Sequence, residues 1–103
     1  MNKERFQKLT GENWPVIADE IPEHMMHGLL DWIEHGVSGD FIRAVMNNDL
    51  AEAVARADDT NVLLLPQYVK LVYNYFPAPC WGSIEKVQAW QDKKAKNLLE
   101  SEA

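Results

Sequence analysis

Apolar side chains recur along this chain at helical spacing, in segments that end at Pro, Gly, Asn or Asp. The clearest segment is 22–35, where apolar residues fall on one side of a helix and acidic and histidine residues on the other. Pro22 suits the first turn of this helix, and Gly36 supplies a stop after its end. We therefore expect a half-buried helix whose solvent-exposed face carries Glu23, His24, His27, Asp31, Glu34 and His35.

The same pattern predicts further helices, and no alternation with a period of two predicts a strand. Their expected spans are 3–9, 39–47, 49–58, 61–76 and 84–98. Ser38, Thr60 and Ser83 precede three of these segments and are expected to cap them. The side chains expected to face inward are Phe6 and Leu9, then Phe41, Ile42, Val45 and Met46, then Leu50, Ala53, Val54 and Ala57, and finally Ile84, Val87 and Trp90. Residues 11–20 are expected to connect two helices, pinned across the core by Trp14, Val16 and Ile17.

Segment 61–76 is apolar around most of its circumference, with Gln67, Lys70 and Asn74 as its only polar stripe. A helix of this kind belongs at the centre of a bundle, packed by several others. Pro66 either kinks this helix or marks its true first turn, and the sequence leaves both alternatives open.

These elements together predict an all-α fold, a compact orthogonal bundle of about five helices around the central apolar helix. We expect a single domain over residues 1–103. Its parts are an N-terminal helix with its connection (1–20), a helical core (21–98) and a frayed tail (99–103).

The net charge of −6 is concentrated in the middle of the chain. Residues 11–69 carry 11 acidic side chains against Arg43 and Arg56, whereas residues 1–10 and 70–103 are slightly basic. Such a surface repels nucleic acid and anionic membranes, and it favours partners with a basic surface. We therefore expect neither direct nucleic-acid binding nor membrane binding.

Catalytic and targeting signals are missing from the sequence. The first ten residues lack the apolar segment of a secretory signal, and the longest apolar run, 62–65, is too short to span a bilayer. The only cysteine, Cys80, excludes an internal disulfide and suits a reducing cytoplasm. Its apolar neighbours raise rather than lower the pKa of a thiol. We expect a cytoplasmic protein that is not an enzyme and that holds no cofactor.

His24, His27 and Asp31 have the chemistry of metal ligands. His27 and Asp31 are one helical turn apart and can reach one ion, but His24 and Asp31 are about 10 Å apart along the axis. A third ligand would have to come from another helix. A metal-binding protein or enzyme built on these residues is therefore the alternative to a solvated helix face.

Three stretches of the sequence resemble one protein family: PEHMMHGLLDWIEHG, GDFIRAVMNNDLAEAVARADDTN, and PAPCWGS with Trp90 after it. The family consists of small all-helical proteins of this size, encoded by bacteriophages and prophages and without an assigned function. The resemblance covers residues 21–90. It implies a phage or prophage origin and the cytoplasm of a bacterial host, and it transfers no catalytic residues.

Charge and resemblance together predict a small acidic accessory protein that binds a host or phage protein with a basic surface. The most specific form of this prediction is that the protein inhibits a host nucleic-acid-handling or defence enzyme. It would do so through the acidic face of its helices 22–35 and 49–58. The expected contact residues are Glu23, His27, Asp31, Glu34, Glu52 and Asp59, with Trp81 as an aromatic anchor. The remaining alternative is a phage structural or assembly protein that forms homo-oligomers through apolar surface around Trp81.

Overall fold

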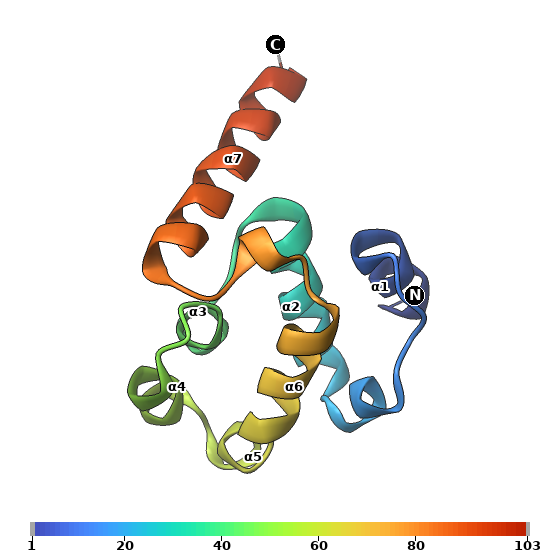
Figure 1. Ribbon diagram of the computed structural model, residues 1–103, viewed down its shortest axis with the longest axis vertical. Helices are drawn as coiled ribbons and strands as arrows, with labels where there is room; N and C mark the ends of the chain where they lie inside the picture. Colours follow the sequence, from blue (N-terminus) through green and yellow to red (C-terminus); the bar gives the residue numbers. More distant parts are fainter. Residues whose placement is uncertain (1, 103) are drawn as a thin grey trace.

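The computed structural model describes residues 2–102, and within this range it is all-helical and contains no strand (Figure 1). The elements are α1 (Asn2–Thr10), η1 (Val16–Glu20), α2 (Glu23–His35), α3 (Asp40–Met46), α4 (Leu50–Arg56), α5 (Asp59–Leu63), α6 (Leu65–Tyr75), η2 (Ala78–Cys80) and α7 (Ile84–Glu102), of which η1 and η2 are short 3-10 helices. The radius of gyration is 13.3 Å, as expected of a compact chain of this length. The predicted all-α bundle is confirmed, with more helices than expected.

The second helix, α2, carries the densest part of the core. Its buried side chains, all on the predicted face, are Met26, Leu29, Leu30, Trp32 and Ile33. Gly36 ends the helix at φ 68°, and a Cβ there would lie 2.9 Å from the Cβ of Lys94, so α7 lies directly against this end. The Trp90 indole donates to the Trp32 carbonyl (3.1 Å), and the Trp32 indole donates to the Cys80 carbonyl (2.9 Å). These buried hydrogen bonds join α2, η2 and α7.

The apolar segment 61–76 forms two helices rather than the single central helix that was predicted. α5 begins after Asp58, whose carboxylate accepts the Asn61 N–H at 2.7 Å, so Asp58 and not Thr60 is the cap. Pro66 lies in the first turn of α6, where its missing N–H leaves no partner unsatisfied. Pro66 therefore starts a helix instead of kinking one.

Of the two other predicted N-caps, Ser83 is confirmed and Ser38 is wrong. The Ser83 hydroxyl accepts the Lys86 N–H at 3.2 Å, as predicted for the start of α7. Ser38 does not cap α3, because Gly39 occupies the N-cap position and contributes no side chain. Asp49 caps α4 by accepting the Glu52 N–H at 3.1 Å.

The two ends of the chain differ in how well their expected packing matches the structure. In α1, Phe6 is fully buried and Leu9 packs against the core, as predicted. The connection 11–20 contains η1, in which Ala18 is buried while Val16 is 85% exposed, so the inward placement of Val16 was wrong. Within α7, Ile84 is likewise exposed rather than inward-facing.

The last helix, α7, continues to Glu102, beyond the end predicted at residue 98, and residue 103 of the predicted tail lies outside the described residues. Figure 1 shows that its C-terminal half projects from the rest of the molecule, along the long 43 Å axis. No helix in residues 2–102 combines the length and the apolar character that crossing a membrane requires.

Candidate protein-docking surface

Part of the predicted acidic face of α2, around Asp31 and Glu34, is held by α1, whereas its other charged and histidine residues stay exposed. Arg5 donates through Nη2 to Asp31 Oδ1 at 2.6 Å and through Nε to Glu34 Oε1 at 2.9 Å, and its side chain is only 21% exposed. Burial by itself lowers the pKa of Arg5, but the hydrogen bonds and charges of Asp31 and Glu34 outweigh it and raise that pKa above its usual value. Two of the predicted contact residues therefore hold α1 against α2.

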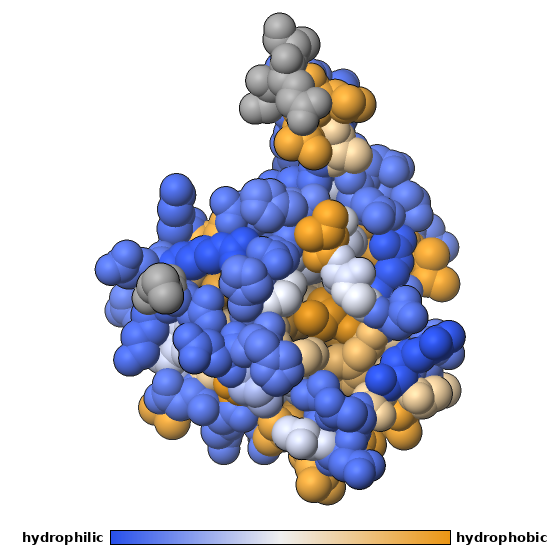
Figure 2. Space-filling view, turned by 180° about the vertical axis from the view of Figure 1, so that it is seen from behind, coloured by the Kyte–Doolittle hydropathy of each residue, from blue (hydrophilic) through white to orange (hydrophobic). Residues whose placement is uncertain are grey.

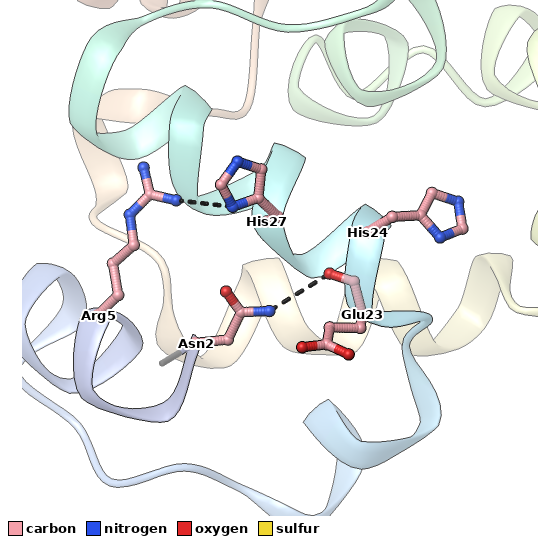
Figure 3. Close-up of a pocket in the computed structure, with 5 residues that line it drawn as sticks. All are labelled: Asn2, Arg5, Glu23, His24 and His27. Carbon is pink, nitrogen blue, oxygen red and sulfur yellow. Dashed lines mark hydrogen bonds between the residues drawn. The ribbon is translucent and has the colours of Figure 1, made fainter.

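The histidines of α2 point to different sides. His27 Nε2 lies 3.4 Å from Asp31 Oδ2, and its Nδ1 lies 3.4 Å from Arg5 Nη1. Figure 3 shows Arg5 and His27 pointing toward one another, whereas His24 points away from both. Glu23 lies beside His24, and its carbonyl accepts the Asn2 amide at 3.3 Å. His27 is thus part of the network that joins α1 to α2, and His24 is not.

An open groove of about 820 Å³ separates the first turns of α1 and α2 (Figure 3). Its lining is Asn2, Arg5, Glu23, His24 and His27. Across residues 2–102, no three His, Cys, Asp or Glu side chains lie close enough together to hold a metal ion. The geometry therefore does not bring His24, His27 and Asp31 together as ligands.

The remaining predicted acidic contacts lie away from α2. Figure 1 places α4 and α1 at opposite edges of the body, so Glu52 does not share a face with the α2 residues. Glu52 Oε1 is 2.6 Å from Arg56 Nε, and Arg56 also approaches Asp40 at 3.7 Å. Asp59 is exposed in the first turn of α5. The six predicted acidic and histidine contacts therefore do not form one binding face.

A surface of exposed apolar side chains begins on α4. Of the predicted inward stripe of this helix, Ala53 is buried and Ala57 half-buried, but Leu50 is 68% exposed and Val54 is exposed as well. The small Ala53 lets α4 lie close to its neighbours, which leaves the larger side chains on either side of it outside. Asn48, at φ 60°, turns the chain into α4 and so sets the direction in which Leu50 points.

The same apolar surface continues over α6. Leu50 and Val69 line one shallow groove of about 40 Å³ formed by α3, α4 and α6. Tyr73 follows Val69 by one helical turn and is 71% exposed, although the pattern predicted burial on nearly all sides of this segment. Lys70 bounds this surface on the side of α6 that is turned away from α4.

Trp81 ends this surface, half-buried as predicted for an anchor residue. Its ring packs edge-to-face on Tyr73, with 6.0 Å between the ring centroids. The turn that carries Trp81 is held in place because the Gly82 N–H donates to the Met46 carbonyl at 2.7 Å. We call the five residues Leu50, Val54, Val69, Tyr73 and Trp81 the apolar strip.

Further apolar and acidic side chains surround the apolar strip. In Figure 2, the view from behind, apolar side chains reach the surface at the lower edge, where α5 lies, and Leu63 of α5 is exposed. Asp49 lines the same groove as Leu50, while Asp58 and Asp59 stand at the start of α5. Within the described residues, none of these three carboxylates forms an ion pair. Asp49 and Asp58 also accept the N-cap hydrogen bonds of α4 and α5. We call Asp49, Asp58 and Asp59 the acidic rim.

Cys80 offers no nucleophile. Its side chain is fully buried, and burial raises the pKa of the thiol to about 12. A thiol in this environment stays neutral at physiological pH, and the neutral form is unreactive. The raised pKa confirms the effect expected from its apolar neighbours.

No protein-family model, curated protein or solved structure matches this chain. The resemblance to phage-encoded proteins and the cytoplasmic location therefore stay predictions.

Proposed function

We propose that this protein is a non-catalytic binding module that docks onto a protein partner through the apolar strip. The observation that carries the proposal is the exposure of Leu50 and Val54 on α4 and of Val69 and Tyr73 on α6, with Leu50 and Val69 lining one groove. Isolated exposed apolar residues are ordinary, but a connected apolar surface beside a polar rim marks an interaction site. Trp81 supplies the kind of aromatic side chain that dominates binding energy at interfaces.

The partner presents an amphipathic helix with apolar side chains along one face and Lys or Arg on its flanks. A helix suits the apolar strip, because apolar anchors at i, i+3 and i+4 spacing pack against exposed apolar side chains such as those of α4 and α6. The groove of about 40 Å³ between these helices is too small to enclose it. The acidic rim of Asp49, Asp58 and Asp59 favours basic flanks and speeds their encounter. The proposed partner is still basic, as the charge of the chain predicts. The proposed contact surface, however, lies on α4 and α6 instead of α2.

The class of partner to test first is a nucleic-acid-handling or defence enzyme of a bacterial host. Such enzymes carry basic surfaces that contact phosphates, and those surfaces suit an acidic rim. The resemblance to phage-encoded proteins supports this choice, and inhibition by occupying the basic surface is the corresponding action. Cys80 does not support a catalytic alternative, because its thiol is buried and its pKa is raised to about 12.

The direct test is the affinity of the full chain for a synthetic Leu/Lys helix with leucines at i, i+3, i+4 and i+7, measured by calorimetry. The wild type is expected to bind it, and the Leu50→Gln/Tyr73→Gln variant is expected to bind at least about tenfold more weakly, because two apolar contacts are lost. Val16→Gln, at an equally exposed apolar site outside the strip, is the matched control and should bind like the wild type. A Leu/Glu peptide of the same pattern should not bind. Equal affinity of all the variants for the Leu/Lys peptide would refute the proposed surface.

A second step identifies the natural partner. Wild type and both variants are used as baits in nuclease-treated bacterial lysate. The partner is a protein retained by the wild type and by Val16→Gln but not by the strip variant, and it must bind in the same order when purified. A purified candidate that binds the strip variant as tightly as the wild type does not use this surface.

A further inference from the structure

Met25 is the only methionine within residues 2–102 that is partly exposed. Its side chain lies half-buried in the first turn of α2, whereas Met26 and Met46 are 1% and 0% exposed. A peroxide in solution therefore reaches the thioether of Met25 before it reaches the thioethers of Met26 and Met46.

A buried amide points at the sulfur of Met25. Asn61 of α5 is 6% exposed and is the only buried polar side chain within the described residues. Its Nδ2 lies 3.7 Å from Met25 Sδ, and its Oδ1 accepts the Tyr68 hydroxyl at 2.6 Å. The hydrogen bond from Tyr68 holds the amide in this orientation, so the amide nitrogen stays directed at the sulfur.

The thioether of Met25 is a weak acceptor for this amide. Across residues 2–102, Asn61 Nδ2 has no oxygen or nitrogen acceptor and donates only to the sulfur. Most buried polar groups have a strong partner, because a buried donor without one costs free energy. Asn61 is therefore a buried donor that lacks a strong acceptor, next to an atom that can gain an oxygen.

The distance between the two atoms suits an oxygen carried by the sulfur. A sulfoxide S–O bond is about 1.5 Å long, and an amide N–H donates to oxygen over about 2.8 Å. With an angle of about 120° at the oxygen, these lengths place nitrogen and sulfur about 3.8 Å apart. The observed separation is 3.7 Å, so α2 and α5 need not move to make this hydrogen bond. The unbranched methionine side chain can rotate to direct the oxygen at Asn61.

We propose that Met25 is a peroxide-modification site whose sulfoxide oxygen accepts the Asn61 amide. The sulfur lone pair attacks one oxygen of hydrogen peroxide, the S–O bond forms, and the O–O bond breaks. Sulfur loses two electrons, and the second oxygen leaves as water after it takes the proton of the first. A sulfoxide usually disrupts the packing of a core, but here it supplies a buried donor with a strong acceptor and joins α2 to α5.

The test treats the full chain with dilute hydrogen peroxide and follows it by peptide mass spectrometry and thermal unfolding. Met25 should gain one oxygen before Met26 and Met46 do. The modified wild type should have a Tm about 4–8 °C higher, the shift that one net hydrogen bond gives a chain of this size. Met25→Leu lacks the sulfur and should show no rise after the same treatment.

A double variant separates the role of the amide from that of the sulfur. Asn61→Leu/Tyr68→Phe removes the donor together with the hydroxyl that would lose its acceptor, so the pair is replaced by apolar groups. Peroxide should lower the Tm of this variant, because the sulfoxide then has no donor and enters an apolar environment. A rise as large as that of the wild type would show that Asn61 does not receive the oxygen.

Nuclear magnetic resonance of the wild type gives a direct readout even if the double variant does not fold. One side-chain amide proton of Asn61 should move downfield on oxidation and exchange more slowly with solvent, because oxygen is a stronger acceptor than sulfur. Unchanged Asn61 resonances would overturn the proposal. A Tm of the modified wild type that stays the same or falls would do so too, as would oxidation of Met26 or Met46 as fast as Met25.

Discussion

Removing the charge of Arg5 tests whether the acidic face of α2 is an internal contact. Arg5→Met keeps the apolar stem and deletes the guanidinium that reaches Asp31 at 2.6 Å and Glu34 at 2.8 Å. The two carboxylates, three residues apart on one helix, then face each other without a cation. Two partly exposed ion pairs contribute about 0.2–1 kcal/mol each, and the new repulsion adds a few tenths. The expected loss of stability is about 1–2 kcal/mol.

Urea and thermal unfolding measure this loss. For a chain of this size each kcal/mol lowers the Tm by roughly 4–8 °C, so the change is readily resolved. Glu23→Gln, on the same face of α2 but outside the Arg5 network, is the control and should lower stability by less than about 1 kcal/mol, the contribution of a carboxylate in the first turn of a helix. Neutralising both partners, with Asp31→Asn and Glu34→Gln added to Arg5→Met, should restore part of the loss. Wild-type stability in Arg5→Met would refute the view that these acids serve to hold α1.

Three other expectations follow from buried groups and backbone geometry. Burial raises the pKa of Cys80 from 9.0 to about 12 and the pKa of Tyr68 from 10.0 to about 12. As the pH rises, these two groups therefore lose their protons first in the unfolded chain. Their contribution to stability is complete below about pH 9 and is lost as the pH rises toward 12. Urea titrations at increasing pH should show this loss, and a stability that is flat from pH 8 to pH 11 would contradict it. The Cys80 thiol should react with a disulfide reagent only as fast as the chain unfolds; immediate reaction in buffer would show that it is accessible. Gly36→Ala should destabilise the chain by about 1–3 kcal/mol, and Gly11→Ala should destabilise it by less. Both glycines adopt positive φ, but only at Gly36 would the new Cβ meet Lys94. Equal losses of stability in thermal unfolding would count against this close packing.

Helix ends and helix faces that are marked by neighbouring residues could be predicted from the sequence. The stop at Gly36 and the buried face of α2 follow from sequence spacing alone, and both are confirmed. The split of segment 61–76 did not follow, because Pro66 is compatible with a kink and with a first turn. In the structure the backbone leaves helical geometry at Leu64 (φ −98°, ψ 4°), so α5 ends there and Pro66 falls in the first turn of α6.

Burial on α4 and α6 was mispredicted for the same physical reason. Periodicity identifies an apolar face, but the number of neighbours available to cover it depends on the whole fold. Leu50 and Val69 were assigned to apolar, inward-facing positions, although both are exposed and belong to the surface on which the proposed function rests.

The contact of Arg5 with Asp31 and Glu34 also lay outside the reach of pattern analysis, because it joins residues 26 and 29 positions apart. The charge map contained a hint. The first ten residues are basic and the following segment is acidic, and such neighbours attract. In the structure Asp31 and Glu34 of this acidic face bind a basic group of the same chain, Arg5, and the basic protein partner stays a prediction.

The most direct test of the central claim is a map of amide chemical-shift changes in the full chain on addition of the Leu/Lys helix. If the apolar strip is the docking surface, the changes should cluster at residues 49–54, 66–73 and 81–82, and they should disappear in Leu50→Gln/Tyr73→Gln. The amides of α2 from Glu23 to Glu34 should stay in place. Changes centred on α2, with residues 49–54 and 66–73 unaffected, would contradict the account and return the binding site to the acidic face of α2.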